Sequence, residues 1–99
     1  MSESNQKKDV KDGFDLIDFP CDYAFKAMCK VTDNVDLPAS LTELMLTMIS
    51  EGELLEVRSA SSRTGKFESV TLKVKVLDRN QLELIYQTIA DSPLVVMTL

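Results

Sequence analysis

Hydrophobic and polar residues alternate near the middle of the chain. Between residues 67 and 77 every second position is aliphatic, at Val70, Leu72, Val74 and Val76, and serine, threonine and lysine stand between them. Successive side chains of a β-strand point to opposite faces, so the aliphatic residues share one face and the polar residues share the other. The pattern predicts a strand with one buried and one solvated face.

Three further strands are predicted, at residues 23–31, 53–60 and 94–99. The second of these is joined to the central strand by a serine-rich loop at residues 59–66. Gly65 lies in this loop, and we expect it to adopt a positive φ in a hairpin connection. A phosphate-binding loop would be richer in glycine and would lead into a helix, so this loop is not interpreted as one.

Helical spacing predicts two helices. The first covers about residues 39–51 and places one apolar stripe at Leu41, Leu44, Met45, Met48 and Ile49. Ser40 or Pro38 is expected to start it, Glu43 to complete a capping box with Ser40, and Gly52 to end it. The second begins after Asp78, capped by Asp78 and Gln81, and ends near Asp91, with a stripe at Leu82, Ile85, Tyr86 and Ile89.

The predicted order is β-α-β-β-α-β, which favours an α+β, ferredoxin-like sandwich: a four-stranded antiparallel sheet with two helices on one face. A single domain is expected at residues 14–99, preceded by a disordered tail at residues 1–13. Residues 14–20 are expected to form a lead-in arm. The side chains predicted to face the helices are Phe25, Ala27, Cys29, Val57, Val70, Leu72, Val74, Val76, Val95 and Met97.

The composition and charge of the chain indicate where the protein resides and which partners are disfavoured. The chain has 99 residues, 44% of them hydrophobic, no apolar run long enough to span a membrane and no signal-like segment. We therefore expect a soluble, cytoplasmic protein. The net charge is −5 and falls on the predicted domain, because the charges of residues 1–13 cancel. Such a field disfavours nucleic acid and anionic membranes as partners.

The side chains offer little catalytic chemistry. The chain has no histidine and two cysteines, so the common catalytic triads and zinc sites are not available. Neither a metal nor a cofactor is expected, and the chain is not interpreted as an enzyme. Cys29 belongs to the predicted core. A thiol-dependent role for Cys21 is kept as an alternative, and Asp33 with Asp36 is expected to be a solvated pair in a loop.

The sheet face away from the helices is the candidate binding surface, because uncovered faces with apolar patches often bind ligands or partners. Leu94, Glu56 and Thr98 are expected there, with the candidate site residues Lys26, Met28, Lys30, Arg58, Thr71, Lys73 and Val96. An unknown protein, a small ligand or a second copy is the expected partner. Single-stranded RNA remains an alternative, although positions 69, 71 and 73 lack the aromatic side chains that stack bases.

Short motifs resemble one known family. They are Asp18-Phe19-Pro20-Cys21-Asp22-Tyr23, then Phe25-Lys26, Ser61-Ser62, Gly65, Phe67, Ser69-Val70 and Val96-Met97-Thr98-Leu99. In order and spacing they are similar to the YbeD-like family of small bacterial proteins. The resemblance implies a ferredoxin-like fold similar to ACT domains, no established enzyme activity and a lipoate-linked regulatory role. The chain departs from the family pattern at Ala27, Met28, Cys29 and Phe67.

Overall fold

The computed structural model describes residues 17–99 of the chain. Their elements are β2 (Cys21–Lys30), α2 (Leu37–Met45), the 3-10 helix η2 (Glu51–Glu53), β3 (Leu54–Ser61), β4 (Phe67–Val76), α3 (Arg79–Ala90) and β5 (Val95–Thr98). The predicted order of four strands and two helices is therefore confirmed. The predicted tail at residues 1–13 and the first residues of the lead-in arm lie outside the described residues.

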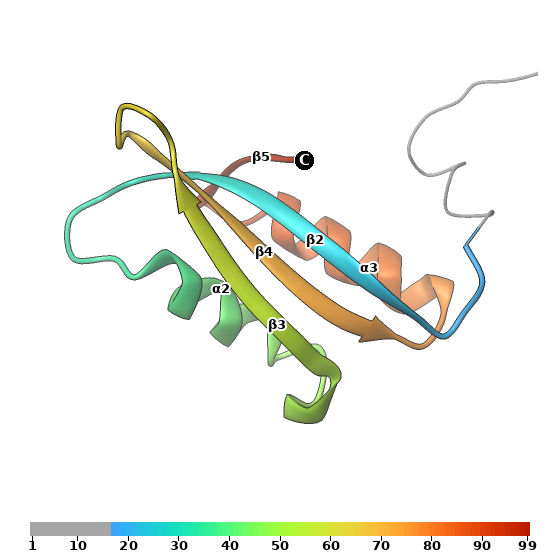
Figure 1. Cartoon of the computed structure of the whole chain (residues 1–99). Coiled ribbons are helices and arrows are strands. Elements are labelled where there is room, and N and C mark those ends of the chain that lie inside the picture. Colours follow the sequence, from blue (N-terminus) through green and yellow to red (C-terminus); the bar gives the residue numbers. More distant parts are fainter. Residues whose placement is uncertain (1–16) are drawn as a thin grey trace, which may run out of the picture.

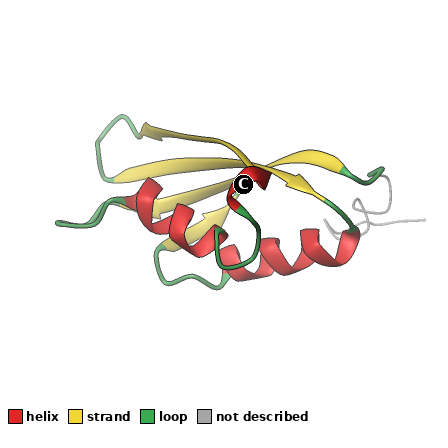
Figure 2. Cartoon of the chain, turned by 90° about the horizontal axis from the view of Figure 1, so that it is seen from below, coloured by secondary structure: helices red, strands yellow, loops and turns green. Residues whose placement is uncertain are grey.

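The four strands form one antiparallel sheet in the order β3-β4-β2-β5 (Figure 1). Both α-helices lie on the same face of this sheet, and a view turned by 90° shows strands and helices as two layers (Figure 2). The predicted α+β, ferredoxin-like sandwich is confirmed. One face of the sheet is therefore packed, and the opposite face carries no helix within residues 17–99.

The core lies between the sheet and the helices. From β2 and β4 it takes the alternate residues Phe25, Ala27, Cys29, Val70, Leu72, Val74 and Val76, each at most 3% exposed. The helices contribute Leu37, Leu41, Met45, Leu82, Ile85 and Ile89. Val57 and Val95 are half-buried and pack against this cluster. The predicted inward set is thus confirmed for these strand residues, and Met97 is the exception.

Helix α2 is shorter than predicted. It begins after Asp36, whose Oδ1 accepts a hydrogen bond from the Ala39 N–H at 3.1 Å, so the expected Ser40 capping box is wrong. It ends at Met45 instead of Glu51, because the following residues form tighter turns. Ile49 is nevertheless buried, so the apolar stripe continues past the end of the helix.

Helix α3 begins and ends as predicted. Asp78 caps it by accepting a hydrogen bond from the Gln81 N–H at 2.8 Å. The Gln81 side chain accepts in turn from the Leu77 N–H at 2.7 Å, so both residues contribute to the start of the helix. The last helical residue is Ala90, and Asp91 is the C-cap.

The hairpin between β3 and β4 confirms the expected role of Gly65, whose φ is +76°. The Gly65 N–H donates to the Ser62 carbonyl at 3.0 Å, and the Ser62 hydroxyl accepts from the Phe67 N–H at 3.1 Å. These bonds close the turn and fix the register of the two strands.

Strand β5 departs from the predicted alternation. Val95 pairs with Cys29, but Met97 pairs with Met28, so Val96 is the extra residue of a β-bulge. The prediction that Met97 points toward the helices is wrong. Its side chain is 49% exposed and lies beside Met28 on the other face.

Two more residues near β5 lie on the helix side of the sheet and not on its open face, which is the face away from the helices. Thr98 was expected on the open face, but it pairs with buried Ala27, and its hydroxyl lies 3.0 Å from the Tyr86 hydroxyl of α3. Leu94 was also expected on the open face. It precedes β5 and packs against the core instead, so both predictions are wrong.

Candidate functional site

The predicted binding residues of β2, β3 and β4 share the face opposite the helices. On β2 and β4, each of these residues is next in sequence to a residue that is buried under the helices. Arg58 of β3 pairs with Thr71 of β4, so it lies on the same face. This set is Lys26, Met28, Lys30, Arg58, Thr71 and Lys73. Val96 is 57% exposed in the bulge of the edge strand β5. The structure therefore brings six of the seven together, and their role in binding stays a prediction.

Strand pairing arranges the side chains of this face in rows. One row consists of Arg58, Thr71 and Lys26. The next consists of Ala60, Ser69, Met28 and Met97. Longer side chains thus surround two small ones, Ala60 and Ser69, and leave a depression between them.

Two hollows lie along these rows of side chains. One, of about 240 Å³, is lined by Lys26, Arg58, Ser59, Ala60, Ser69 and Thr71. The other, of about 110 Å³, is lined by Met28, Ala60, Ser61, Ser62, Phe67 and Ser69. Because both contain Ala60 and Ser69, they are neighbouring parts of one groove, which we call the sheet groove. Its first part holds two cationic side chains, and its second part holds the apolar Met28 and Phe67.

The open face differs in charge from the chain as a whole. Among the described strand residues, two acidic side chains lie on it, Asp22 and Glu56, and the basic ones are Lys26, Lys30, Arg58, Lys73 and Lys75. The chain has a net charge of −5. Arg58 pairs with Glu56 through Nε at 3.0 Å, and its guanidinium carries further N–H donors. The local excess of positive charge favours anions at this face.

Both cysteines are free and belong to the helix side of β2. Burial raises the pKa of the half-buried Cys21 thiol, and the charge of Asp22 raises it further. Burial also raises the pKa of Cys29, with a smaller contribution from Glu68. A raised pKa lowers the thiolate fraction at neutral pH, so neither site has the environment of an activated cysteine.

No three cysteine or carboxylate side chains in residues 17–99 are placed to hold a metal ion. None of the helices in that range is long and apolar enough to cross a membrane.

The sequence alone did not identify Ala60, Ser69 and Phe67 as residues of the groove. Phe67 was recognisable as an aromatic residue at the start of β4, but its neighbours depend on the register between β3 and β4. That register is set by the closed turn at Ser62 and Gly65. The small pair at Ala60 and Ser69 becomes visible only after the two strands are aligned.

One solved structure is similar along most of the chain. The solution structure of protein HP0495 from H. pylori superposes with a TM-score of 0.61 and covers 84% of this chain and 85% of its own. Its sequence identity is 23%, so this likeness concerns the fold.

Sequence comparison gives the family. The family described as "Protein of unknown function (DUF493)" matches residues 15–99. A UPF0250 protein of Nitrosomonas europaea is 33% identical over 90 residues, covering 85% of this chain and 94% of that protein. A UPF0250 protein of Paraburkholderia phymatum is also 33% identical, over 86 residues, covering 85% and 92%. The resemblance to YbeD-like proteins is thereby confirmed, and the chain belongs to the DUF493 family, whose function is unknown.

Proposed function

We propose that the chain is a non-enzymatic binding module that holds small amphipathic carboxylates in the sheet groove. The observation that carries this proposal is the composition of the groove along its length. Lys26 and Arg58 line one part, Met28 and Phe67 line the other, and both parts share Ala60 and Ser69. A ligand with an anionic head and an apolar chain matches this order.

The expected interactions follow from ordinary chemistry. A carboxylate accepts charge-assisted hydrogen bonds from lysine and arginine, and these are stronger than neutral ones. The apolar chain of the ligand then covers Ala60 and contacts Met28 and Phe67, with a gain of about 0.8 kcal/mol for each methylene fully removed from water. The groove is shallow, so part of the ligand stays solvated and binding is reversible.

Lipoate and octanoate are the ligands we place first. Each combines a carboxylate with an apolar chain, and the YbeD resemblance implies a lipoate-linked regulatory role. In this proposal the chain senses such acids in the cytoplasm and passes the signal to a partner protein.

The proposal is tested by titrating octanoate and lipoate into the protein and three variants. Arg58→Gln removes one groove cation, and Ala60→Leu fills the shared part of the groove. Lys75→Gln is the matched control, because it removes the same charge from the same face outside the groove. We expect Arg58→Gln and Ala60→Leu each to weaken binding about tenfold. The control should stay within about twofold.

Two results contradict this assignment. If Ala60→Leu leaves the affinity unchanged, the groove is not the binding site. If Lys75→Gln weakens binding as much as Arg58→Gln, the acid is attracted only by the diffuse charge of the face.

RNA is the second candidate function, and the basic open face is the observation that favours it. Phe67 lies at the start of β4, and the middle of that strand offers Ser69, Thr71 and Lys73 instead of stacking aromatics. A titration with a short RNA single strand at low salt distinguishes the two. Affinity that falls steeply with added salt and is insensitive to Ala60→Leu supports RNA over carboxylate binding.

A further inference from the structure

A second groove lies on the helix side of the sheet, between α2 and the loop that joins α3 to β5. Its volume is about 370 Å³. Its apolar lining consists of Leu41, Leu44, Pro93 and Leu94. Leu41 is buried, whereas Leu44 and Leu94 are half-buried, so apolar surface of both leucines stays open to a partner. We call this groove the helix groove.

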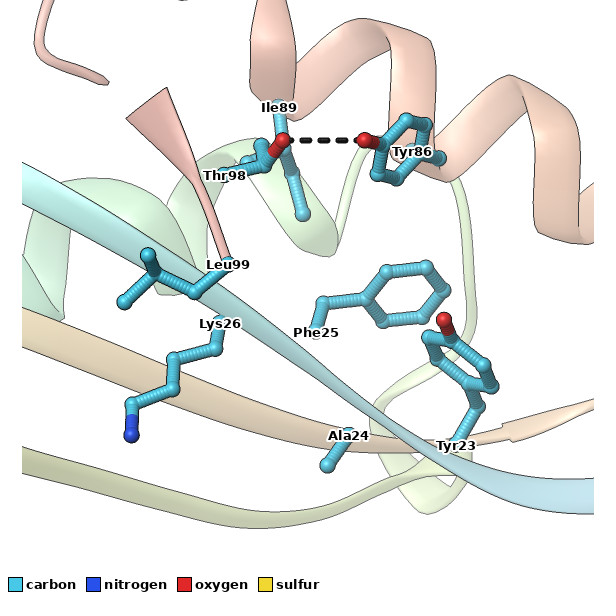
Figure 3. Close-up of a pocket in the computed structure, with 8 residues that line it drawn as sticks. All are labelled: Tyr23, Ala24, Phe25, Lys26, Tyr86, Ile89, Thr98 and Leu99. Atoms are coloured by element: carbon cyan, nitrogen blue, oxygen red, sulfur yellow. Dashed lines mark hydrogen bonds between the residues drawn. The ribbon is translucent and has the colours of Figure 1, made fainter. Parts of the chain in front are cut away.

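The loop that forms one wall of the helix groove is anchored on both sides. The Ser92 N–H donates to the Ile89 carbonyl at 3.1 Å, and the Val95 N–H donates to the Ser92 carbonyl at 3.0 Å. The Tyr86 and Thr98 hydroxyls lie 3.0 Å apart and tie the end of β5 to α3 (Figure 3). The wall is therefore held in place by bonds of the chain itself, and the groove is pre-formed.

Both ends of the described chain lie outside the helix groove. After the groove, the chain enters β5 beside Cys29 and leads away to Leu99, whose N–H donates to the Lys26 carbonyl at 2.8 Å (Figure 3). Ile17 precedes the start of β2, whereas Cys29 lies near the end of that strand. Within residues 17–99, only α2, the turn after it and the loop before β5 line the groove.

The two segments that line the helix groove carry only acidic charges. Residues 31–55 contain no lysine or arginine and five carboxylates, at Asp33, Asp36, Glu43, Glu51 and Glu53. Residues 80–99 also lack lysine and arginine and contain Glu83 and Asp91. Glu43 itself lines the groove and is exposed, and Asp91 directly precedes the loop. The basic residues of the open face lie on the other side of the sheet, so the helix groove favours a cationic partner.

The backbone around the groove is already paired. The Ser92 N–H bonds to Ile89, the Leu94 N–H donates to the Ser92 hydroxyl at 3.2 Å, and Pro93 has no N–H. The N–H groups of residues 40–47 bond within α2 and the turns around it. An extended segment would find no donors here for its carbonyl groups. A helix satisfies its own backbone groups, so it suits this groove better than a strand.

We propose that the helix groove binds a short amphipathic helix of a partner protein, with its apolar side chains against Leu44 and Leu94 and its lysine or arginine residues beside Glu43. The groove follows α2 and its last turn from Ser40 to Thr47, a length of about 10 Å. Two turns of a helix cover this length, so the partner carries apolar residues at i, i+3, i+4 and i+7. Docking of an amphipathic helix in an apolar groove is an established mode of recognition.

This inference goes beyond the proposed function and does not rest on it. The helix groove and the sheet groove share no residue, and they lie on opposite sides of the sheet. The charges around them are also opposite in sign. A ligand of one groove is therefore distinguished from a ligand of the other by the variants that weaken it.

The test is a titration of the full-length protein with a basic amphipathic peptide. The probe is acetyl-Ala-Lys-Leu-Lys-Ala-Leu-Leu-Ala-Ala-Leu-Lys-Ala-Lys-Ala-amide, whose leucines form one helical stripe flanked by lysines. In the comparison peptide, glutamate replaces each lysine. We expect the basic peptide to bind with a Kd below about 1 mM and the acidic one to bind at least about tenfold more weakly.

Two pairs of variants locate the binding site. Ser40→Phe fills the groove and should weaken binding of the basic peptide at least about tenfold, whereas Ala39→Phe adds the same bulk to α2 outside the groove and should stay within about twofold. Glu43→Gln removes the lining carboxylate and should weaken binding about three- to fivefold. Glu51→Gln removes an exposed carboxylate outside the groove and should stay within about twofold.

Three results would overturn the proposal: no binding of the basic peptide at about 1 mM, equal binding of the two peptides, or equal effects within either pair of variants. Circular dichroism checks the fold of each variant, and if Ser40→Phe is unfolded, the Glu43 and Glu51 pair decides. Arg58→Gln should bind the peptide normally while it binds octanoate weakly. Failure of the sheet groove is thereby separated from failure of the helix groove.

Discussion

Strand β4 presents Leu72 to the helices and its neighbours Thr71 and Lys73 to the opposite face. Leu72 is fully buried, Thr71 lines the sheet groove and Lys73 is exposed. Neighbouring residues of one strand thus belong to two surfaces, and the two surfaces place different requirements on their side chains. Residues of the helix side must fill the core at close packing, so they determine stability. Residues of the open face have few packing partners and are free to be selected for binding.

The largest expected difference between the faces is in stability. Leu72→Ala leaves a cavity between the sheet and the helices and should lower the free energy of unfolding by about 2–5 kcal/mol. Thr71→Val keeps the β-branched shape one residue away and should change it by less than about 0.5 kcal/mol. Urea unfolding followed by circular dichroism measures both. Similar losses in the two variants would show that the open face is packed.

The accessibility of the two cysteines tests how tightly the helix side of the sheet is packed. Cys29 is fully buried near the end of β2, whereas Cys21 is half-buried at its start. Alkylation of the folded protein, followed by mass spectrometry, should modify Cys21 first and Cys29 only when the sheet opens. Burial raises the pKa of both thiols, so both reactions should need a higher pH than in the unfolded chain. Rapid labelling of Cys29 would contradict the packing described.

The smallest expected effect on stability is at the Glu56–Arg58 ion pair. Both side chains are in contact with solvent, at 71% exposure for Arg58 and 45% for Glu56, so Glu56→Gln should change the free energy of unfolding by less than about 1 kcal/mol. It should, however, release Arg58 and raise the affinity for octanoate. Isothermal titration calorimetry at low salt measures the affinity of the variant for octanoate. A lower affinity would argue against Arg58 as the residue that binds the carboxylate.

Local signals explain why much of the fold could be predicted. The alternation along β2 and β4 indicates two faces, and Asp78 with Gln81 marks the start of α3. Helix α2 shows the limit of such signals. Met48 and Ile49 continue its apolar stripe, but they reach the core from tight turns after the helix has ended. The stripe indicated burial correctly and helix length incorrectly.

Strand β5 and the groove depend on pairing between strands. Val95, Val96 and Met97 are all apolar, so the sequence gives no sign of which one is the bulge. The groove depends on Ala60 meeting Ser69, which is a property of register between strands. The predicted cationic residues were therefore placed on the correct face, but the depression between them could not be foreseen.

Methyl NMR during an octanoate titration tests the division between the two faces most directly. The methyl groups of Ala60 and Met28 lie in the sheet groove, and those of Leu72 and Val74 lie under the helices. We predict saturable shifts of the Ala60 and Met28 signals while the Leu72 and Val74 signals stay in place. Shifts confined to the buried methyl groups, or the absence of any shift, would contradict the assignment of binding to the open face.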